Sequence, residues 1–435
     1  MKISSAEYVN FFRHSSPYIN AHRGGTFVIH LCGATLAYDG FDNIIHDIAL
    51  LNSLGVRLVL VFGARPQIEQ RIQERGIECT FHDDVRLTSK EVLDSVKDAV
   101  GNLRIRIESL LSMGLANSPM HGARIRVVSG NFVTAKPLGV VDGVDFQQTG
   151  EVRRIDHEAI SQLLSDGYVV LLSCLGSSPT GEVFNLPVEQ VATATAAALR
   201  AQKLILFGAN DGVCTDSGEL QRQMRVHQAR ALLPQLSAEP KRLLHAAINA
   251  CEQGVNRSHI IGHATDGALL QELFTRDGAG TLITQQGYEE TRQACIEDVG
   301  GILELIQPLE EQGVLVRRSR KQLEREIGLF TVVERDGMII GCASLHPFSD
   351  ARCAELACVA IHPDYRKGNR GDLLLEYAEE FARKQGTERL FVLTTRTAHW
   401  FVERGFNEIQ VDQLPDAKKE LYNLQRNSKV FEKQL

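Results

Sequence analysis

A basic, glycine-containing loop near the C-terminal end of the chain has the composition of an anion-binding site. The loop follows the apolar run 355–361 and consists of Arg366, Lys367, Gly368, Asn369, Arg370 and Gly371. After it, residues 373–382 place apolar side chains at helical spacing, so we predict a strand, the loop and a helix. Backbone N–H groups at a helix N-terminus lack partners within the helix, and the helix dipole attracts negative charge there. The cationic side chains and the glycines therefore predict a binding site for a diphosphate.

The sequence of this loop excludes two common classes of phosphate-binding site. It lacks the Gly-Lys-Ser/Thr ending of a Walker loop, and it is not a G-x-G-x-x-G turn that opens a Rossmann unit. It resembles the coenzyme A pyrophosphate loop of GCN5-related N-acetyltransferases (GNAT), R/Q-x-x-G-x-G/A, although Asn369 stands where the central glycine is usual. The resemblance implies that acetyl-CoA binds here and that the main chain of Val359, Ala360 and Ile361 contacts it. An ordinary solvated strand-to-helix turn is the alternative.

Three residues near the loop are candidates for the chemistry of acetyl transfer to an amine. Glu355 is a carboxylate in an apolar strand, where we expect burial to raise its pKa toward that of a useful base; a carboxylate held by a nearby arginine is the alternative. Thr394, at the end of the predicted strand 390–394, is placed to hold a water for that base. Cys358 is a candidate acetyl carrier but is more often a small core residue. Phe401 replaces the tyrosine that the family often uses as an acid, so the acid stays open.

Arginines on both sides of the loop predict binding of carboxylates. Arg318, beside Val316 and between Arg317 and Arg320, precedes the loop, and Arg426 follows it. Guanidinium groups suit carboxylates, and two separate sources of them suit a dicarboxylate such as L-glutamate. Solvation at the surface is the alternative for any single arginine.

The bulk composition excludes several classes of protein. A length of 435 residues predicts two or three domains, and a net charge of -7 argues against general binding of nucleic acid. The nine cysteines form no C-x-x-C pair, so we expect no disulfide framework and no metal site. No apolar run reaches membrane-spanning length. We therefore expect a cytoplasmic protein without a membrane partner.

The N-terminal part predicts an α/β domain. Residues 1–22 predict a helix that carries Phe11 and Phe12 and packs on another subunit or on its own domain. From Thr26 onward, apolar strands alternate with helices; the predicted strands are 27–31, 56–62, 169–173, 203–207 and 259–262, and the first predicted helix is 41–54. This rhythm predicts a parallel sheet covered by helices on both faces.

Residues 25–283 resemble the amino-acid kinase family, and most of all the acetylglutamate kinases. Three segments carry the resemblance: Phe184-Asn185-Leu186 with the run 192–199, Pro240-Lys241 with the run 246–255, and the run 263–281. The residues of phosphoryl transfer are replaced, because His30-Leu-Cys-Gly33 stands for Lys-x-Gly-Gly, Phe62-Gly-Ala-Arg-Pro66 for His-Gly-Gly-Gly-Pro, and Ala209 for an acid. Phosphoryl transfer depends on charged groups around the phosphates, and of these only Lys241 remains. We therefore expect a regulatory domain rather than a kinase.

Arginine-inhibited acetylglutamate kinases carry an additional N-terminal helix and bind arginine beside it. The resemblance implies an L-arginine pocket, with Glu272 on the cationic end of the ligand and the main chain of Gly278, Gly280 and Thr281 nearby. A solvated helix residue is the alternative for Glu272.

The second half of the chain predicts an acetyltransferase domain. We expect residues 1–22 as an N-terminal helix, 23–284 as the kinase-like domain, 285–294 as a linker and 295–435 as the GNAT domain. The second domain opens with a helix predicted over 291–312, and Asp336-Gly337 predicts a hairpin between the strands 330–333 and 338–345. The expected fold class is an α/β parallel-sheet sandwich followed by an α+β acetyltransferase.

The two domains together resemble the family of bacterial N-acetylglutamate synthases. The resemblance implies the reaction of acetyl-CoA with L-glutamate to give N-acetyl-L-glutamate and CoA, the first step of arginine synthesis, with feedback by L-arginine and a homo-hexameric assembly. Two alternatives stay open at this point. One is an active amino-acid kinase, and the other is an arginine-binding regulatory protein with an inactive transferase domain.

Overall fold

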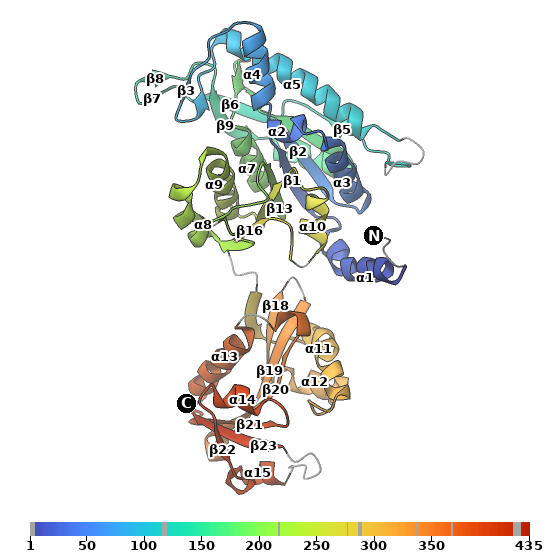
Figure 1. Cartoon of the computed structure of the whole chain (residues 1–435), viewed down its shortest axis with the longest axis vertical. Coiled ribbons are helices and arrows are strands. Elements are labelled where there is room, and N and C mark those ends of the chain that lie inside the picture. Colours follow the sequence, from blue (N-terminus) through green and yellow to red (C-terminus); the bar gives the residue numbers. More distant parts are fainter. Residues whose placement is uncertain are drawn as a thin grey trace. The chain divides into compact units, whose positions relative to one another are not determined.

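The computed structural model describes residues 5–114, 120–215, 218–275, 277–285, 289–335, 338–366, 369–420 and 428–435. The chain forms two compact units, Met1–Gln286 and Gly287–Leu435, and each is described by itself (Figure 1).

The first unit is a three-layer sandwich around an eight-stranded sheet of order β14-β16-β15-β13-β1-β2-β10-β5. The paired strands are parallel, except that β16 runs antiparallel to β15. The strands of this sheet are β1 (Thr26–Leu31), β2 (Arg57–Phe62), β5 (Val127–Val128), β10 (Val169–Ser173), β13 (Lys203–Gly208), β14 (Gln223–Arg225), β15 (Arg257–Gly262) and β16 (Thr281–Thr284). The prediction of a parallel sheet covered on both faces is confirmed.

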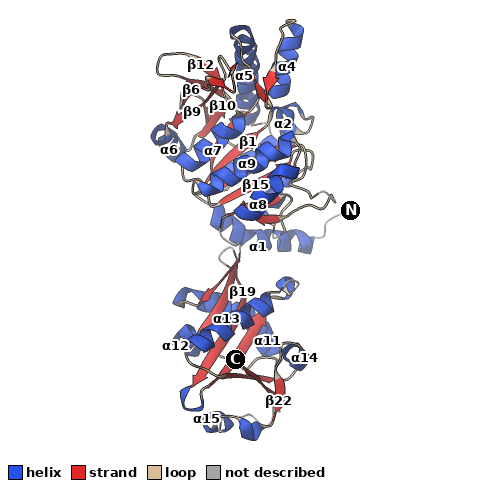
Figure 2. Cartoon of the chain, turned by 90° about the vertical axis from the view of Figure 1, so that its left-hand side faces the viewer, coloured by secondary structure: helices blue, strands red, loops and turns tan. Residues whose placement is uncertain are grey.

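Two separate apolar cores cover the two faces of this sheet, because successive side chains of a strand point to opposite sides. Phe27, Ile29 and Leu31 of β1 pack with one set of helices, whereas Val28 packs with the other. The first set is α2 (Gly33–Ala37), α3 (Phe41–Ser53), α4 (Arg65–Glu74), α5 (Lys90–Leu111) and α10 (Ala268–Phe274). The second set is α6 (His157–Ser165), α7 (Val188–Ala198), α8 (Val226–Leu232) and α9 (Ala238–Glu252), of which α7 and α9 lie across the strands in Figure 2.

Smaller sheets complete the first unit. The second core also includes a four-stranded sheet of order β12-β11-β6-β9. The remaining strands are β3 (Phe81–His82), β4 (Val85–Arg86), β6 (Val133–Pro137), β7 (Val140–Val141), β8 (Val144–Asp145), β9 (Gly150–Ile155), β11 (Leu175–Ser177) and β12 (Val183–Asn185), of which β3–β4 and β7–β8 form hairpins.

Helix α1 (Ser5–His22) forms where a helix was predicted. Its last residue, His22, makes a 2.8 Å hydrogen bond through Nε2 to the carbonyl oxygen of Leu273 in α10, which attaches the helix to its own unit. Phe11 and Phe12 remain 56% and 57% exposed. The helix therefore packs on its own unit at its C-terminal end and presents two aromatic rings to solvent.

The second unit is built on a seven-stranded sheet of order β17-β18-β19-β20-β21-β23-β22, in which only the β20–β21 pair is parallel. Helix α13 covers one face and α11 and α12 cover the other (Figure 1). The strands are β17 (Glu289–Gln293), β18 (Phe330–Arg335), β19 (Met338–Phe348), β20 (Cys353–Ile361), β21 (Arg389–Thr394), β22 (Asn407–Ile409) and β23 (Lys429–Gln434). The helices are α11 (Val299–Glu311), α12 (Arg320–Glu326), α13 (Arg370–Lys384), α14 (Ala398–Val402) and α15 (Asp416–Lys419).

Two expectations for the start of this unit are wrong. The expected linker 285–294 contains strand β17, and the helix predicted over 291–312 begins only at Val299. Strand β17 pairs with β18, and Arg292 binds Asp298 with two hydrogen bonds of 2.7 and 2.8 Å and Glu334 with another of 2.6 Å. These ion pairs hold the segment as an edge strand. The predicted turn at Asp336-Gly337 lies outside the described residues, but the strands on either side of it pair antiparallel as expected.

Candidate active site

The sheet of the second unit opens between β20 and β21. The two strands pair only at three positions, from Cys353 opposite Arg389 to Glu355 opposite Phe391. Beyond that point β20 continues to Ile361 with β19 as its partner, and β21 continues with β23. The main chain of 356–361 on the β21 side therefore has no neighbouring strand, and buried backbone groups without partners are costly. In this opening, the amide groups of a ligand can form the hydrogen bonds that a neighbouring strand would otherwise form.

A bulge lies beside the opening. Cys342 pairs with Ala360 and Ser344 with Ala357, so β20 contains one more residue than β19 over this stretch. Cys358 takes up the extra residue with a φ of +52°, a left-handed conformation that most side chains avoid. The bulge lies directly before Val359, Ala360 and Ile361, which belong to the part of β20 that does not pair with β21. These are the three residues whose main chain was predicted to contact acetyl-CoA.

Strand β20 leads through a short turn into the N-terminus of α13. Asn369 is the N-cap and makes no side-chain hydrogen bond to the first turn. The first N–H groups of a helix need partners from outside it, so this terminus is available to an anion. Arg366 is exposed beside it, whereas Lys367 and Gly368 lie outside the described residues.

Arg370 is used differently from the expectation. Its guanidinium forms two hydrogen bonds with the carboxylate of Glu289, at 2.8 and 2.6 Å, and a third at 2.9 Å with the carbonyl oxygen of Tyr365. Because Glu289 belongs to β17, this side chain fixes the loop to the edge strand. That Arg370 is part of the phosphate cradle stays a prediction; its backbone N–H, in the first turn of α13, points to that role more directly than its side chain.

Gly371 is required by packing. A Cβ at this position would lie 2.9 Å from Cζ2 of Trp400, whose ring covers the first turn of α13. Arg404 in turn stacks on Trp400 at 4.1 Å and makes an ion pair with Asp372. Packing against Trp400 is therefore one reason for a glycine here, and the access of a ligand to the backbone at Gly371 stays a prediction.

Glu355 lies on the α11/α12 face of the sheet. Its neighbours Ala354 and Leu356 pack with α13, so alternation turns Glu355 to the opposite side. The residue is 8% exposed. Oε2 accepts a 2.6 Å hydrogen bond from Nζ of Lys418 in α15. The expected alternative, a carboxylate held by an arginine, is close to what is observed, but the partner is a lysine more than sixty residues away.

Sequence reasoning missed two residues of this site, Lys418 and His346. His346 is the direct partner of Glu355 in the β19–β20 pairing. Burial lowers the pKa of His346, while the Glu355 carboxylate acts in the opposite direction. Neither residue has a motif around it, and only the register of the sheet and the fold of the tail bring them to Glu355.

Arg318 enters the same region from the segment between α11 and α12. Its backbone N–H donates to Oε1 of Glu310 at 2.9 Å, and its charge lowers the pKa of His346. Val316 is 58% exposed next to it, and its carbonyl oxygen accepts a 3.4 Å hydrogen bond from Arg318. The structure therefore brings Arg318 and Glu355 to one site; Arg426 lies outside the described residues.

Thr394 and Cys358 have local partners. The Thr394 hydroxyl lies 2.8 Å from that of Thr397 and accepts the backbone N–H of Thr397 at 3.0 Å, so it stabilises the turn after β21. That Thr394 holds a water for the base stays a prediction. Cys358 is 5% exposed in the core formed with α11. Phe401, also buried, stacks edge-on against Phe406.

The predicted effector residue Glu272 is not a solvated helix residue, so that alternative is wrong. Its side chain is 4% exposed and accepts hydrogen bonds from Nδ1 of His259 at 2.6 Å and from the N–H groups of Ala279 and Gly280 at 2.7 and 2.8 Å. Burial alone would raise the pKa of Glu272, but the hydrogen bonds from His259 and from the two amides lower it. Nζ of Lys203 lies 3.4 Å from Nε2 of His259, so Lys203 joins the same group of buried, hydrogen-bonded side chains.

The phosphate loops of the kinase-like unit are filled by the protein itself. A Cβ at Gly33 would lie 2.5 Å from Cδ of Pro66, so the two loops pack on each other. Arg65 forms a 2.7 Å ion pair with Asp84, which Arg242 also binds. His30, in the place of the kinase lysine, is fully buried, and its burial lowers its pKa to about 3. The expectation that kinase chemistry is absent is supported by this packing.

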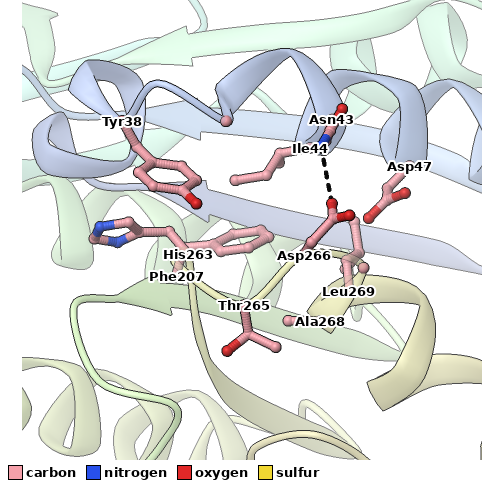
Figure 3. A pocket seen from close by; sticks show the side chains of 12 residues that line it. Tyr38, Asn43, Ile44, Asp47, Phe207, His263, Thr265, Asp266, Ala268 and Leu269 are labelled. Carbon is pink, nitrogen blue, oxygen red and sulfur yellow. Dashed lines mark hydrogen bonds between the residues drawn. The ribbon is translucent and has the colours of Figure 1, made fainter.

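A pocket of the first unit lies between α3 and the loop that precedes α10 (Figure 3). It encloses about 290 Å³, part of it open to solvent, and Asp47 and Asp266 face each other across it. Asn43 donates a 3.0 Å hydrogen bond to Asp266. Burial and the neighbouring Asp266 carboxylate raise the pKa of Asp47 to about 7.

This shift predicts a pH-dependent stability. Between the unfolded pKa of about 3.9 and the folded value of about 7, the folded state binds a proton that the unfolded state has lost. Stability therefore falls as the pH rises through this window. We expect Asp47→Asn to raise the melting temperature at pH 8 and to leave it nearly unchanged at pH 4, measured by calorimetry. Asp39→Asn removes the same charge from an exposed position and serves as the control; equal effects of Asp47→Asn at both pH values would contradict the prediction.

In the part of the chain that the structure describes, one group of side chains has the spacing of metal ligands: His82, Asp83 and Asp142, all near the surface. No helix among the described residues is both long enough and apolar enough to cross a bilayer.

Known proteins match both units. Residues 24–262 match the model of the amino acid kinase family, and residues 301–406 match that of the acetyltransferase (GNAT) family. An amino-acid acetyltransferase of Pseudomonas syringae pv. tomato is 59% identical over 428 residues, 98% of this chain and 99% of the relative. One from Azotobacter vinelandii is 59% identical over 430 residues, 99% of this chain and 100% of the relative.

A solved structure matches both units as well. The N-acetylglutamate synthase of Neisseria gonorrhoeae, in complex with coenzyme A and L-arginine, superimposes with a TM-score of 0.92 at 37% identity and covers 98% of this chain and 99% of its own. The same enzyme has been solved with coenzyme A and N-acetyl-glutamate; that structure is 38% identical with a TM-score of 0.64 over the same shares of the two chains.

Proposed function

The chain belongs to the family of amino-acid acetyltransferases, in which an amino-acid-kinase fold precedes a GNAT fold, and from this premise we propose that it transfers the acetyl group of acetyl-CoA to the amino group of L-glutamate. The products are N-acetyl-L-glutamate and CoA, and the reaction is the first step of L-arginine biosynthesis. The observation that carries the proposal is the opening between β20 and β21, which leads directly to an uncapped helix N-terminus.

The backbone groups of the donor site can form the hydrogen bonds that acetyl-CoA needs. The unpaired edge of β20 offers amides to the pantetheine arm, and the free N–H groups of the first turn of α13 suit a diphosphate. Arg366 adds a positive charge at that end, and Lys367 and Gly368 are proposed to contribute to the same cradle. The matched synthase structures contain coenzyme A.

The acceptor site fits an amino acid with two carboxylates. Arg318 and Lys418 approach the Glu355 region from two separate elements, and Arg426 is proposed to supply a third cation. Two cations that lie apart suit an α-carboxylate and a side-chain carboxylate better than a single charge. A basic substrate such as lysine would place its own cation among them, which is unfavourable.

The reaction is a direct transfer with base assistance. Glu355 removes a proton from the substrate ammonium, directly or through a water, and the amine nitrogen then attacks the thioester carbonyl carbon. The new C–N bond forms as the C–S bond breaks, and CoA leaves as a thiolate, which takes up the second proton that the nitrogen loses as the amide forms. A thiolate with a pKa of about 8.5 needs no protein acid to leave, and Phe401 offers none.

Release of free thiol from acetyl-CoA tests the proposal. We expect a rate with L-glutamate that exceeds the rates with L-aspartate, L-glutamine and L-lysine. L-Glutamine lacks the second carboxylate, L-lysine carries a cation in its place, and L-aspartate carries it on a side chain that is one methylene shorter. Equal rates with L-glutamate and L-glutamine would contradict the proposal that two cations bind two carboxylates of the substrate. Absence of thiol release with every amino acid would reject the function.

The kinase-like unit is proposed to bind L-arginine and to inhibit the transferase. A carboxylate has about four acceptor positions, and Glu272 uses three of them within its own unit, which leaves one for a guanidinium N–H. Gly278, Gly280 and Thr281 line the same turn. The exposed Phe11 and Phe12 of the neighbouring α1 helix support a contact with another subunit. The homo-hexameric state and the location in the cytoplasm are proposed from the resemblance alone.

We expect Glu272→Gln to weaken inhibition by arginine at least tenfold while the activity without arginine is kept. Glutamine still accepts the amides of Ala279 and Gly280 but lacks the charge that a guanidinium pairs with. The control is Glu252→Gln, which removes an exposed carboxylate paired with Arg230 in the same unit. Unchanged arginine inhibition in Glu272→Gln would reject Glu272 as the effector residue.

A further inference from the structure

The hydrogen bonds around His346 determine which of its ring nitrogens carries the proton. Nε2 of His346 lies 3.1 Å from the hydroxyl oxygen of Ser344, and that hydroxyl donates its proton to the carbonyl oxygen of Ala357 at 3.2 Å. A hydroxyl has one proton to donate, so Ser344 accepts at its oxygen and His346 donates Nε2–H. In the neutral ring Nδ1 therefore holds a free lone pair.

The surroundings of this imidazole are those of a proton acceptor. Burial lowers the pKa of His346, so the ring is neutral at physiological pH. The charged groups that face it come from each element packed against it. Glu355 of β20 and Glu326 of α12 favour the protonated ring, whereas Arg318 and Lys418 disfavour it. Oε2 of Glu326 is buried without a hydrogen-bond partner among the described residues.

Glu355 has one oxygen free to take a proton. Lys418 binds Oε2, and no described residue donates to Oε1. An imidazole directly opposite in the register, with an unprotonated Nδ1, is placed to take that proton on and so restore the carboxylate.

We propose that His346 is the proton relay of the acetyl transfer: Glu355 takes the proton from the acceptor ammonium and passes it to Nδ1 of His346, which releases it to solvent. The relay rests on the proposed function, since it needs an amine acceptor at Glu355. The proton balance closes, because the first proton of the ammonium passes through Glu355 and His346 to solvent, and the second proton, which the nitrogen loses as the amide forms, goes to the CoA thiolate. The carboxylate and the neutral ring are both restored, and Ser344 accepts Nε2–H throughout.

The first test is the pH profile of His346→Gln, whose amide N–H replaces Nε2–H toward Ser344 but which has no titrating base. We expect kcat to fall roughly ten- to a hundredfold with little change in the KM values. Because burial lowers the pKa of His346, the wild-type kcat/KM is expected to fall only at pH values below the ordinary histidine range, and this loss is expected to disappear in the variant. The control is His399→Gln, which changes a histidine of α14 that the relay does not use. An unchanged kcat and acid limb in His346→Gln would overturn the relay, even if the wild-type protein acetylates glutamate.

The second test does not depend on the substrate. In protein labelled with ¹⁵N-histidine, the His346 ring, identified by comparison with His346→Gln, is expected to show the Nε2–H tautomer with an unprotonated Nδ1 at pH 7.5. A proton on Nδ1 would overturn the relay. Absence of glutamate acetylation by the wild-type protein would reject the proposed function, and the relay with it.

Discussion

Replacement of Glu355 by glutamine is expected to lower kcat by about 10²- to 10⁴-fold, the usual contribution of a general base. Glutamine keeps the shape of the side chain and an acceptor for Lys418, so we expect the affinity for acetyl-CoA to stay within about twofold. Stopped-assay thiol release gives kcat, and titration calorimetry gives the affinity.

The matched control for this variant is Glu408→Gln. Glu408 lies in β22, the last strand of the same sheet, and also pairs with a lysine, Lys429, at 3.1 Å, but both side chains are exposed. Exposed ion pairs contribute little, so its kcat is expected to equal the wild-type value. If Glu355→Gln kept more than a tenth of wild-type kcat, Glu355 would not be the base.

Gly280→Ala is expected to destabilise the first unit by about 3 kcal/mol or more. A Cβ at this position would lie 2.1 Å from the carbonyl oxygen of Ile260 and 2.7 Å from Cγ2 of Ile261. The first of these atoms belongs to the backbone of strand β15, in the middle of the sheet, and has little freedom to move.

The single tryptophan of the chain, Trp400, lies in the second unit and separates the two unfolding events. In Gly280→Ala we expect thermal unfolding followed by far-UV circular dichroism to shift to lower temperature, while the unfolding reported by Trp400 fluorescence is unchanged. The control is Gly101→Ala, where an added Cβ meets no atom within 4 Å and alanine favours helix α5. Equal stability of Gly280→Ala and Gly101→Ala would contradict the packing described around Gly280.

Most of the main sheet of the first unit could be predicted because its strands are continuous apolar runs. Strands β1, β2, β10, β13 and β15 lie where they were expected. Strand β17 was missed because its sequence, Glu289–Gln293, is polar throughout and gives no hydrophobic period. It forms through ion pairs with residues far along the chain, among them Glu334, and such pairs leave no local signal. For the same reason the linker was placed over it.

Some residues of the candidate site could likewise be predicted from the sequence, and others could not. The loop 366–371 and Glu355 stand out in the sequence, since residue types that disagree with their surroundings indicate chemistry. His346 and Lys418 do not, because their role depends on the register between β19 and β20 and on the position of α15. The sequence shows Arg370 as a cation in the loop but gives no sign of its ion pair with Glu289. That partner lies 81 residues away in the sequence.

The most direct measurement of the central proposal is a competition. The protein is mixed with acetyl-CoA that carries ¹³C in the acetyl group and with the twenty common amino acids at equal concentration, and the labelled products are identified by mass spectrometry. We expect N-acetyl-L-glutamate to be the dominant labelled product and its formation to cease with Glu355→Gln. Label found mainly on lysine, on another amino acid or on Cys358 of the protein would contradict the assignment of the donor opening and the dicarboxylate site.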